Sequence, residues 1–222
     1  MISSEKAIQF IIDQEDGGAR YYERTEEHWD WPGGASGPTC GVGYDCGYST
    51  ADQIRADWKD YVDEETLQAI IRGAGKAGNA GHIFVINNHG DITIPFDVAV
   101  RQFRDRELPK QEEMAQAALP NFDLLSGDSA GALVSLGFNR GFSGFNSPLP
   151  RFREMHQIRR LMVAGEWALI PVQISSMIRI WPHSHDMIQR RKAEAELFAG
   201  GLKECKPLPV PSPPPAPGGL MP

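Results

Sequence analysis

The stretch that organises the chain is residues 38–48, which read PTCGVGYDCGY. In an extended segment, side chains alternate between two faces. One face is then apolar and is made of Cys40, Val42, Tyr44 and Cys46. The other face places two glycines between a hydroxyl and a carboxylate, in the order Thr39, Gly41, Gly43 and Asp45. Because glycine leaves the backbone open to the approach of a ligand, this second face predicts a site.

A carboxylate also occupies an unusual position in the first predicted helix, residues 4–16, which begins at a serine cap and ends at a pair of glycines. Its apolar stripe starts at Ile8, and the position seven residues later is Glu15. Burial and the negative end of the helix dipole both favour a protonated carboxyl group there, which suits a general acid. The alternative is a glutamate that simply ends the helix and turns to solvent.

The remaining chain is predicted to be mostly helical, with an irregular loop over residues 17–37 and a hairpin over 82–94. Caps, prolines and apolar spacing predict helices over residues 50–61, 63–72, 95–107, 109–119, 128–140, 150–164, 171–180 and 184–199. Residues 128–140 combine small and apolar side chains, so we expect them to form the central buried helix.

Arg190, on the last predicted helix, shares a face with apolar side chains. This spacing predicts that Arg190 points inward, where a guanidinium needs an anionic partner. Spacing alone also allows the alternative, in which the stem of the side chain lies over the core and the charged head stays in water.

Composition limits the classes of function. With 222 residues, 41% of them apolar, the chain can form one domain, predicted over residues 1–204, followed by a proline-rich tail over residues 205–222 that we expect to be disordered. The net charge of −7 argues against nucleic acid as a partner, and the basic runs at 151–160 and 189–192 read as solvated helix faces.

Targeting and metal signals are missing from the sequence. The first residues show no signal peptide, and no apolar run is long enough to span a bilayer, so we expect synthesis in the cytoplasm. Three cysteines do not make a disulfide framework. His183 and His185 are spaced to point to different helix faces, and His82 and His89 lack nearby acidic partners, so neither a metal nor another cofactor is expected.

Four features, in this order along the chain, carry a family resemblance: Glu15 at the end of a helix, the T-x-G-x-G run at 39–43, ALVSLGFNRG at 132–141 and QRRKAEAELF at 189–198. Together they resemble the phage-type lysozymes, also called endolysins or glycoside hydrolase family 24. The string WPGGASGPTCGVGYDCGY at 31–48 is most similar to the branch that contains pesticin. The resemblance spans roughly residues 5–200, which is nearly all of the predicted domain.

The resemblance implies an α+β, mainly α, lysozyme-like fold with two lobes: a small lobe with a β-hairpin, and a helical lobe around a central buried helix. It also implies a muramidase that cleaves the β-1,4 bond between N-acetylmuramic acid and N-acetylglucosamine in peptidoglycan with inversion of configuration. Matched by position, the site residues are Glu15 as general acid, Asp45 as second carboxylate, Thr39 as the hydroxyl that holds water, Arg190 as the partner of Glu15, and Asn139, Tyr44, Gly41 and Gly43 as substrate-binding residues.

One departure from the family pattern concerns the second carboxylate. In better-known phage enzymes the aspartate precedes the threonine, and here Glu23, Glu26, Glu27 and Asp30 occupy that stretch. Asp30 is therefore the alternative to Asp45.

Two other functions stay open at this stage: a lytic transglycosylase, and a catalytically silent module that binds peptidoglycan. For the muramidase and for both alternatives, we expect a monomer that meets bacterial peptidoglycan after release or delivery from the cytoplasm. If the chain is a muramidase, we expect it to be bacteriolytic.

Overall fold

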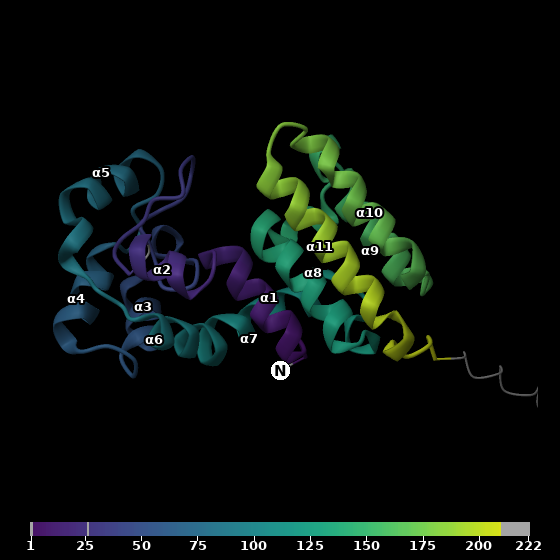
Figure 1. Ribbon diagram of the computed structural model, residues 1–222, viewed down its shortest axis with the longest axis horizontal. Helices are drawn as coiled ribbons and strands as arrows, with labels where there is room; N and C mark the ends of the chain where they lie inside the picture. The colour runs from purple at the N-terminus through teal and green to yellow at the C-terminus, as the bar shows by residue number, and fades with distance from the viewer. Residues whose placement is uncertain (1, 26, 210–222) are drawn as a thin grey trace, which may run out of the picture.

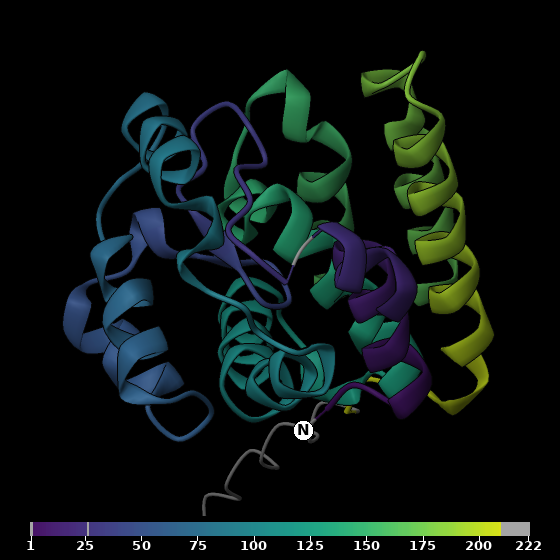
Figure 2. The same ribbon diagram turned by 60° about the vertical axis from the view of Figure 1, so that its left-hand side comes forward.

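The computed structural model describes residues 2–25 and 27–209, which are mainly helical with one two-stranded antiparallel sheet. The helices are α1 (Glu5–Asp16), α2 (Ala19–Thr25), α3 (Ala51–Trp58), α4 (Glu64–Arg72), α5 (Asn79–Asn88), α6 (Phe96–Gln102), α7 (Leu108–Ala118), α8 (Gly127–Arg140), α9 (Arg153–Ala164), α10 (Ile170–Ser176) and α11 (His185–Gly201). The strands are β1 (Thr39–Cys40) and β2 (Tyr44–Asp45). Figure 1 shows α2–α6 gathered on one side and α8–α11 on the other, with α1 and α7 between them, and Figure 2 shows the same separation from another direction.

Helix α8 is the buried element of the second group, as its sequence predicts. Every residue from 129 to 137 is buried, and α1, α7 and α11 all pack against this helix. Small residues allow the close approach: a Cβ added at Gly131 would lie 2.2 Å from the Cβ of Ala7. The glycine therefore lets the backbones of α1 and α8 come closer than any larger residue would permit.

The predicted helix starts in the first third of the chain are confirmed. The Ser4 side chain accepts a hydrogen bond from the backbone of α1, and Gly17 ends that helix in the left-handed conformation, at φ 65°. Thr50 and Gln53 form a reciprocal capping box at the start of α3. The Asp63 carboxylate caps α4.

The predicted hairpin over residues 82–94 is wrong, because most of this segment is helical. Helix α5 runs to Asn88 and a 3₁₀ turn follows over His89–Asp91. Phe84 and Val85 face the core, and the Phe84 ring meets Trp29 edge-on with ring centroids 5.3 Å apart. An apolar run of this length suits a helix or a strand equally well, so the sequence pattern does not distinguish them.

The loop expected over residues 17–37 contains a helix, α2. The Tyr22 ring on α2 is fully buried, lies 5.4 Å from the Phe96 ring and donates its hydroxyl hydrogen to the carbonyl oxygen of Ile94. These contacts with a distant segment stabilise a helix of only seven residues, which would be marginal alone.

The helices predicted on either side of Pro109 form one continuous helical run. A π-helical turn, Phe103–Glu107, joins α6 to α7, and the Leu108 N–H bonds the carbonyl of Phe103. Proline donates no hydrogen bond, and its ring displaces the carbonyl four residues earlier, so the preceding turn widens instead of ending the helix.

The described part of the predicted tail, 205–209, lies against the helical body. The Lys206 N–H bonds the carbonyl of Leu124 at 2.7 Å, and Leu208 packs against the core. Residues 210–222 of the predicted tail lie outside the described residues. Across the described ranges, no helix combines the length and apolar character needed to cross a membrane.

Candidate active site

Residues 38–48 form a tight hairpin in place of one extended segment. Thr39 pairs with Asp45 and Cys40 with Tyr44. The turn depends on glycine, because Gly43 has φ +65° and other residues rarely adopt that conformation. The buried positions of Cys40 and Tyr44 agree with the predicted apolar face.

A third segment extends this small sheet at Asp30. The Asp30 N–H donates to the Thr39 carbonyl at 3.0 Å, and the Thr39 N–H donates to the Asp30 carbonyl at 2.8 Å. Residues paired directly across antiparallel segments place their side chains on the same face. This bridge therefore places the side chains of Asp30 and Thr39 on the same face of the sheet.

A cavity of about 170 Å³ lies over this pairing. It is lined by Glu15, Asp30, Pro32, Thr39, Cys40, Gly41 and Gly43. Glu15, Asp30 and Thr39 thus line one space between the end of α1 and the hairpin. A Cβ added at Gly43 would lie 3.6 Å from Glu15 Oε2, so the glycine keeps the space beside that carboxyl group clear.

Glu15 is held at the cavity by Arg190. The Glu15 side chain is 18% exposed, and its Oε1 accepts a hydrogen bond from Arg190 Nη2 at 2.5 Å. The Arg190 side chain is 7% exposed, so it points inward as its helix position predicts. Burial by itself lowers the pKa of Arg190, but the charges of Glu15 and Glu194 outweigh it and the net shift is upward.

Asp30 is exposed and is anchored through its backbone alone. Within residues 2–25 and 27–209, its carboxylate accepts no hydrogen bond and forms no ion pair. The Thr39 hydroxyl, by contrast, is buried and donates to the carbonyl of Gly37 at 3.3 Å. The Asp30 carboxylate is therefore available to water and to a ligand that enters the cavity.

Asp45, the predicted second carboxylate, contacts backbone donors of its own loop. Its Oδ1 accepts hydrogen bonds from the N–H groups of Gly47, at 2.8 Å, and Gly37, at 3.0 Å. It caps the 3₁₀ turn Cys46–Tyr48 and does not line the cavity that contains Glu15. The carboxylate is turned toward these backbone donors, and Asp30 occupies the cavity position instead.

Two predicted substrate-binding residues also lie away from the cavity lining, whereas Gly41 and Gly43 line it. Tyr44 is buried and donates its hydroxyl hydrogen to Asp57 Oδ2 at 2.9 Å. Burial is the main reason that the pKa of Tyr44 is raised. The Asn139 side-chain oxygen accepts a hydrogen bond from Arg191 Nη2 at 3.1 Å.

The sequence did not predict the buried polar network that lies behind Arg190. Glu194 Oε1 accepts hydrogen bonds from Ser135 Oγ at 2.8 Å, Arg191 Nη2 at 2.9 Å and Arg190 Nε at 3.3 Å. Burial raises the pKa of Glu194, and the charges of Arg191 and Arg190 act against that rise. Helical spacing carried a signal for this residue, because Glu194 lies four positions after the inward-pointing Arg190.

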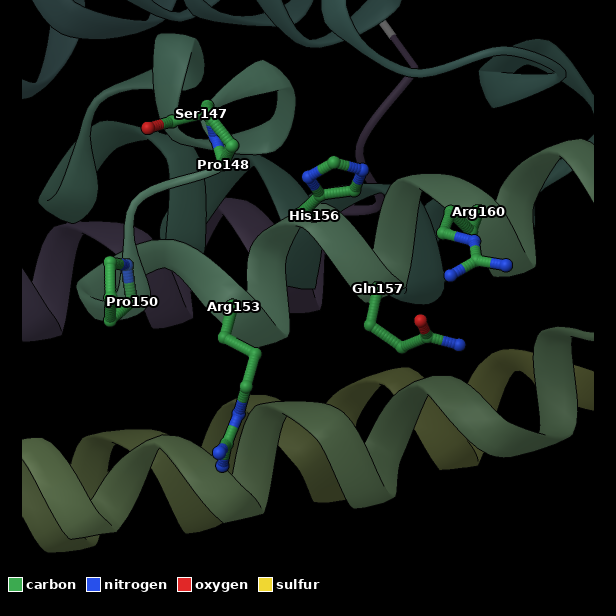
Figure 3. A pocket seen from close by; sticks show the side chains of 7 residues that line it. All are labelled: Ser147, Pro148, Pro150, Arg153, His156, Gln157 and Arg160. Carbon is green, nitrogen blue, oxygen red and sulfur yellow. The ribbon is translucent and has the colours of Figure 1, made fainter.

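Figure 3 shows a second hollow, on the exposed side of α9. Its lining includes Ser147, Pro148, Pro150, Arg153, His156, Gln157 and Arg160. None of these side chains is a carboxylate, so the hollow lacks the pair of carboxyl groups found at the cavity with Glu15.

No protein-family model and no curated protein sequence matches the chain. In the part of the chain that the structure describes, no group of three or more His, Cys, Asp and Glu side chains is arranged to hold a metal ion. The residues at the cavity supply two carboxyl groups and a hydroxyl, with Arg190 behind Glu15.

Proposed function

We propose that the chain is a peptidoglycan muramidase that cleaves the β-1,4 bond between N-acetylmuramic acid and N-acetylglucosamine. The observation that carries the proposal is the shared cavity of Glu15, Asp30 and Thr39. Glycoside hydrolysis needs one carboxylic acid to protonate the leaving oxygen and one carboxylate to act on water or on the transition state.

Glu15 and Asp30 differ in the way this reaction requires. Glu15 is mostly buried at the end of α1, where its Oε2 faces the space kept clear by Gly43, so we assign it as the general acid. Asp30 is exposed and its carboxylate has no partner among the described side chains, so we assign it as the second carboxylate in place of Asp45. We assign Thr39, which is paired with Asp30, to hold the attacking water.

Arg190 orients the acid in this proposal. Its hydrogen bond to Glu15 Oε1 leaves Oε2 for the glycosidic oxygen. Water held by Asp30 and Thr39 would attack the sugar from the opposite face, which corresponds to inversion. The arrangement of elements agrees with a lysozyme-like frame, in which a lobe with a hairpin and a helical lobe around α8 flank the site.

Digestion of purified peptidoglycan sacculi tests the proposal. We expect the chain to release muropeptides with reducing N-acetylmuramic acid ends, and we expect release to fall by 10²–10⁴-fold or more in Glu15→Gln, because the glutamine cannot donate the proton. A folded wild-type chain that binds sacculi without releasing fragments would refute the proposal in favour of a silent binding module. Anhydro-muramic products would instead identify a lytic transglycosylase.

A further inference from the structure

The residue directly behind Arg190 is a fully buried acid, Glu194. Its side chain is 0% exposed, and so is that of Arg191, while Arg190 is 7% exposed. One carboxylate oxygen of Glu194 receives hydrogen bonds from both guanidinium groups and from the Ser135 hydroxyl. Contact with two guanidinium groups favours the ionised form of this carboxylate and acts against the burial that raises its pKa.

The network continues from Glu194 toward the cavity and toward the surface. Toward the cavity, Arg190 Nη2 reaches Glu15 and lies 3.3 Å from both the carbonyl and the hydroxyl oxygen of Ser135 on α8. In the other direction, Arg191 bonds Asn139 and lies with its guanidinium carbon 5.7 Å from the centre of the Trp181 ring. These contacts fix the guanidinium of Arg190 from behind, so its position at Glu15 is determined by the network.

Charge is the second property of this network. The groups that face Glu194 are Arg190 and Arg191 on its own helix and Ser135 on α8, and Arg140 on the same helix as Ser135 acts on Arg191. With Glu194 ionised, the set of Arg190, Arg191 and Glu194 presents a net charge of +1 to Glu15, and without that carboxylate it presents +2. A positive charge beside a carboxyl group favours loss of its proton, which a general acid must keep until it acts.

We infer that Glu194 is a positioning residue for the acid: it holds the Arg190 guanidinium against Glu15 and offsets the positive charge that the arginine pair brings to the catalytic carboxyl group. This inference rests on the proposed function. Arg190 then has two effects on Glu15. Its hydrogen bond orients the carboxyl group, and its positive charge, which would favour loss of the proton, is partly offset by Glu194.

The test compares the full-length chain with Glu194→Gln, which keeps the size of the side chain and removes its charge. We expect the alkaline limb of the pH profile for sacculus hydrolysis to move to lower pH by about one unit, because the acid loses its proton earlier. The carboxyl resonance of Glu15, followed by ¹³C NMR, should titrate at correspondingly lower pH. Glu194→Asp restores the charge and should return most of both shifts.

Glu196→Gln is the matched control, since it makes the same change at an exposed position of the same helix and should shift neither readout. A folded Glu194→Gln with the wild-type pH profile and the wild-type Glu15 titration would overturn the inference. If Glu194→Gln does not fold, the ¹³C carboxyl resonance of Glu194 in the wild-type chain tests the inference. A Glu194 that stays protonated over the active pH range has no negative charge with which to offset the arginines, and this result would overturn the inference. Failure to hydrolyse sacculi would refute the muramidase, while the NMR titrations would still test the coupling.

Discussion

Substituting the two candidate aspartates separately distinguishes a catalytic carboxylate from a structural one. In Asp45→Ala, the N–H groups of Gly37 and Gly47 lose their acceptor. Loss of a helix-capping bond costs about 1 kcal/mol and loss of a hydrogen bond to a charged group about 1.5–3 kcal/mol. Since Asp45 is partly exposed, we take the lower values and expect the free energy of unfolding to fall by about 2–3 kcal/mol.

For a chain of 222 residues this loss corresponds to a decrease of roughly 5–10 °C in Tm.

Asp30→Ala should keep its stability and lose its activity. The Asp30 side chain is exposed and its anchoring bonds come from the backbone, so its loss should change stability by no more than about 0.5 kcal/mol. Because the variant lacks the second carboxylate, hydrolysis should fall by about 10²–10⁴-fold.

Thermal unfolding by circular dichroism and release of reducing ends from sacculi measure the two effects on the same samples. Below its own Tm, Asp45→Ala should retain activity that Asp30→Ala has lost. The reverse result, an inactive Asp45→Ala with wild-type Tm beside a fully active Asp30→Ala, would refute the assignment of Asp30 and return the second carboxylate to Asp45.

Three further substitutions test the packing and the charges. Gly43→Ala should lower the free energy of unfolding by about 1–2 kcal/mol, because φ is +65° at this position. Activity should fall with Tm, because the residue lies beside the catalytic acid. Gly131→Ala should cost about 1–3 kcal/mol, since its Cβ would overlap Ala7. Burial by itself raises the pKa of Glu154, but bonds from Arg179 make the net shift downward, so its stabilising effect is present above pH 4.5 and is lost as the pH falls through the lowered pKa. Glu154→Gln should therefore give a shallower loss of stability between about pH 5 and pH 2, measured by denaturant unfolding.

Each of these substitutions has a control at an open position. Gly90→Ala and Gly200→Ala place a methyl group where no tight contact exists, and both should leave stability almost unchanged or slightly higher. Glu113→Gln makes the charge change of Glu154→Gln at an exposed position of α7 and should keep the wild-type pH dependence. Equal losses in a control and in its matched variant would contradict the packing or charge argument for that site.

The sequence by itself determined the features that depend on neighbouring residues. The caps at Ser4, Thr50 and Asp63 satisfy backbone groups only a few positions away, so their helix starts could be read directly. Helical periodicity likewise placed Glu15 at the end of a buried stripe and turned Arg190 inward. The stripe positions are properties of a single helix, but spacing also allowed a head group in solvent for each residue, and the ion pair between Glu15 and Arg190 decides against it.

Only the tertiary structure decided which aspartate faces Glu15. Alternation along 38–48 favoured Asp45, but the backbone donors of Gly37 and Gly47 engage that carboxylate, and the bridge to Thr39 brings Asp30 to the cavity. Loops carry no periodicity from which such a pairing could be read. A side chain turns toward the hydrogen-bond donors that the folded chain places around it, and those donors come from segments whose proximity exists only once the chain has folded.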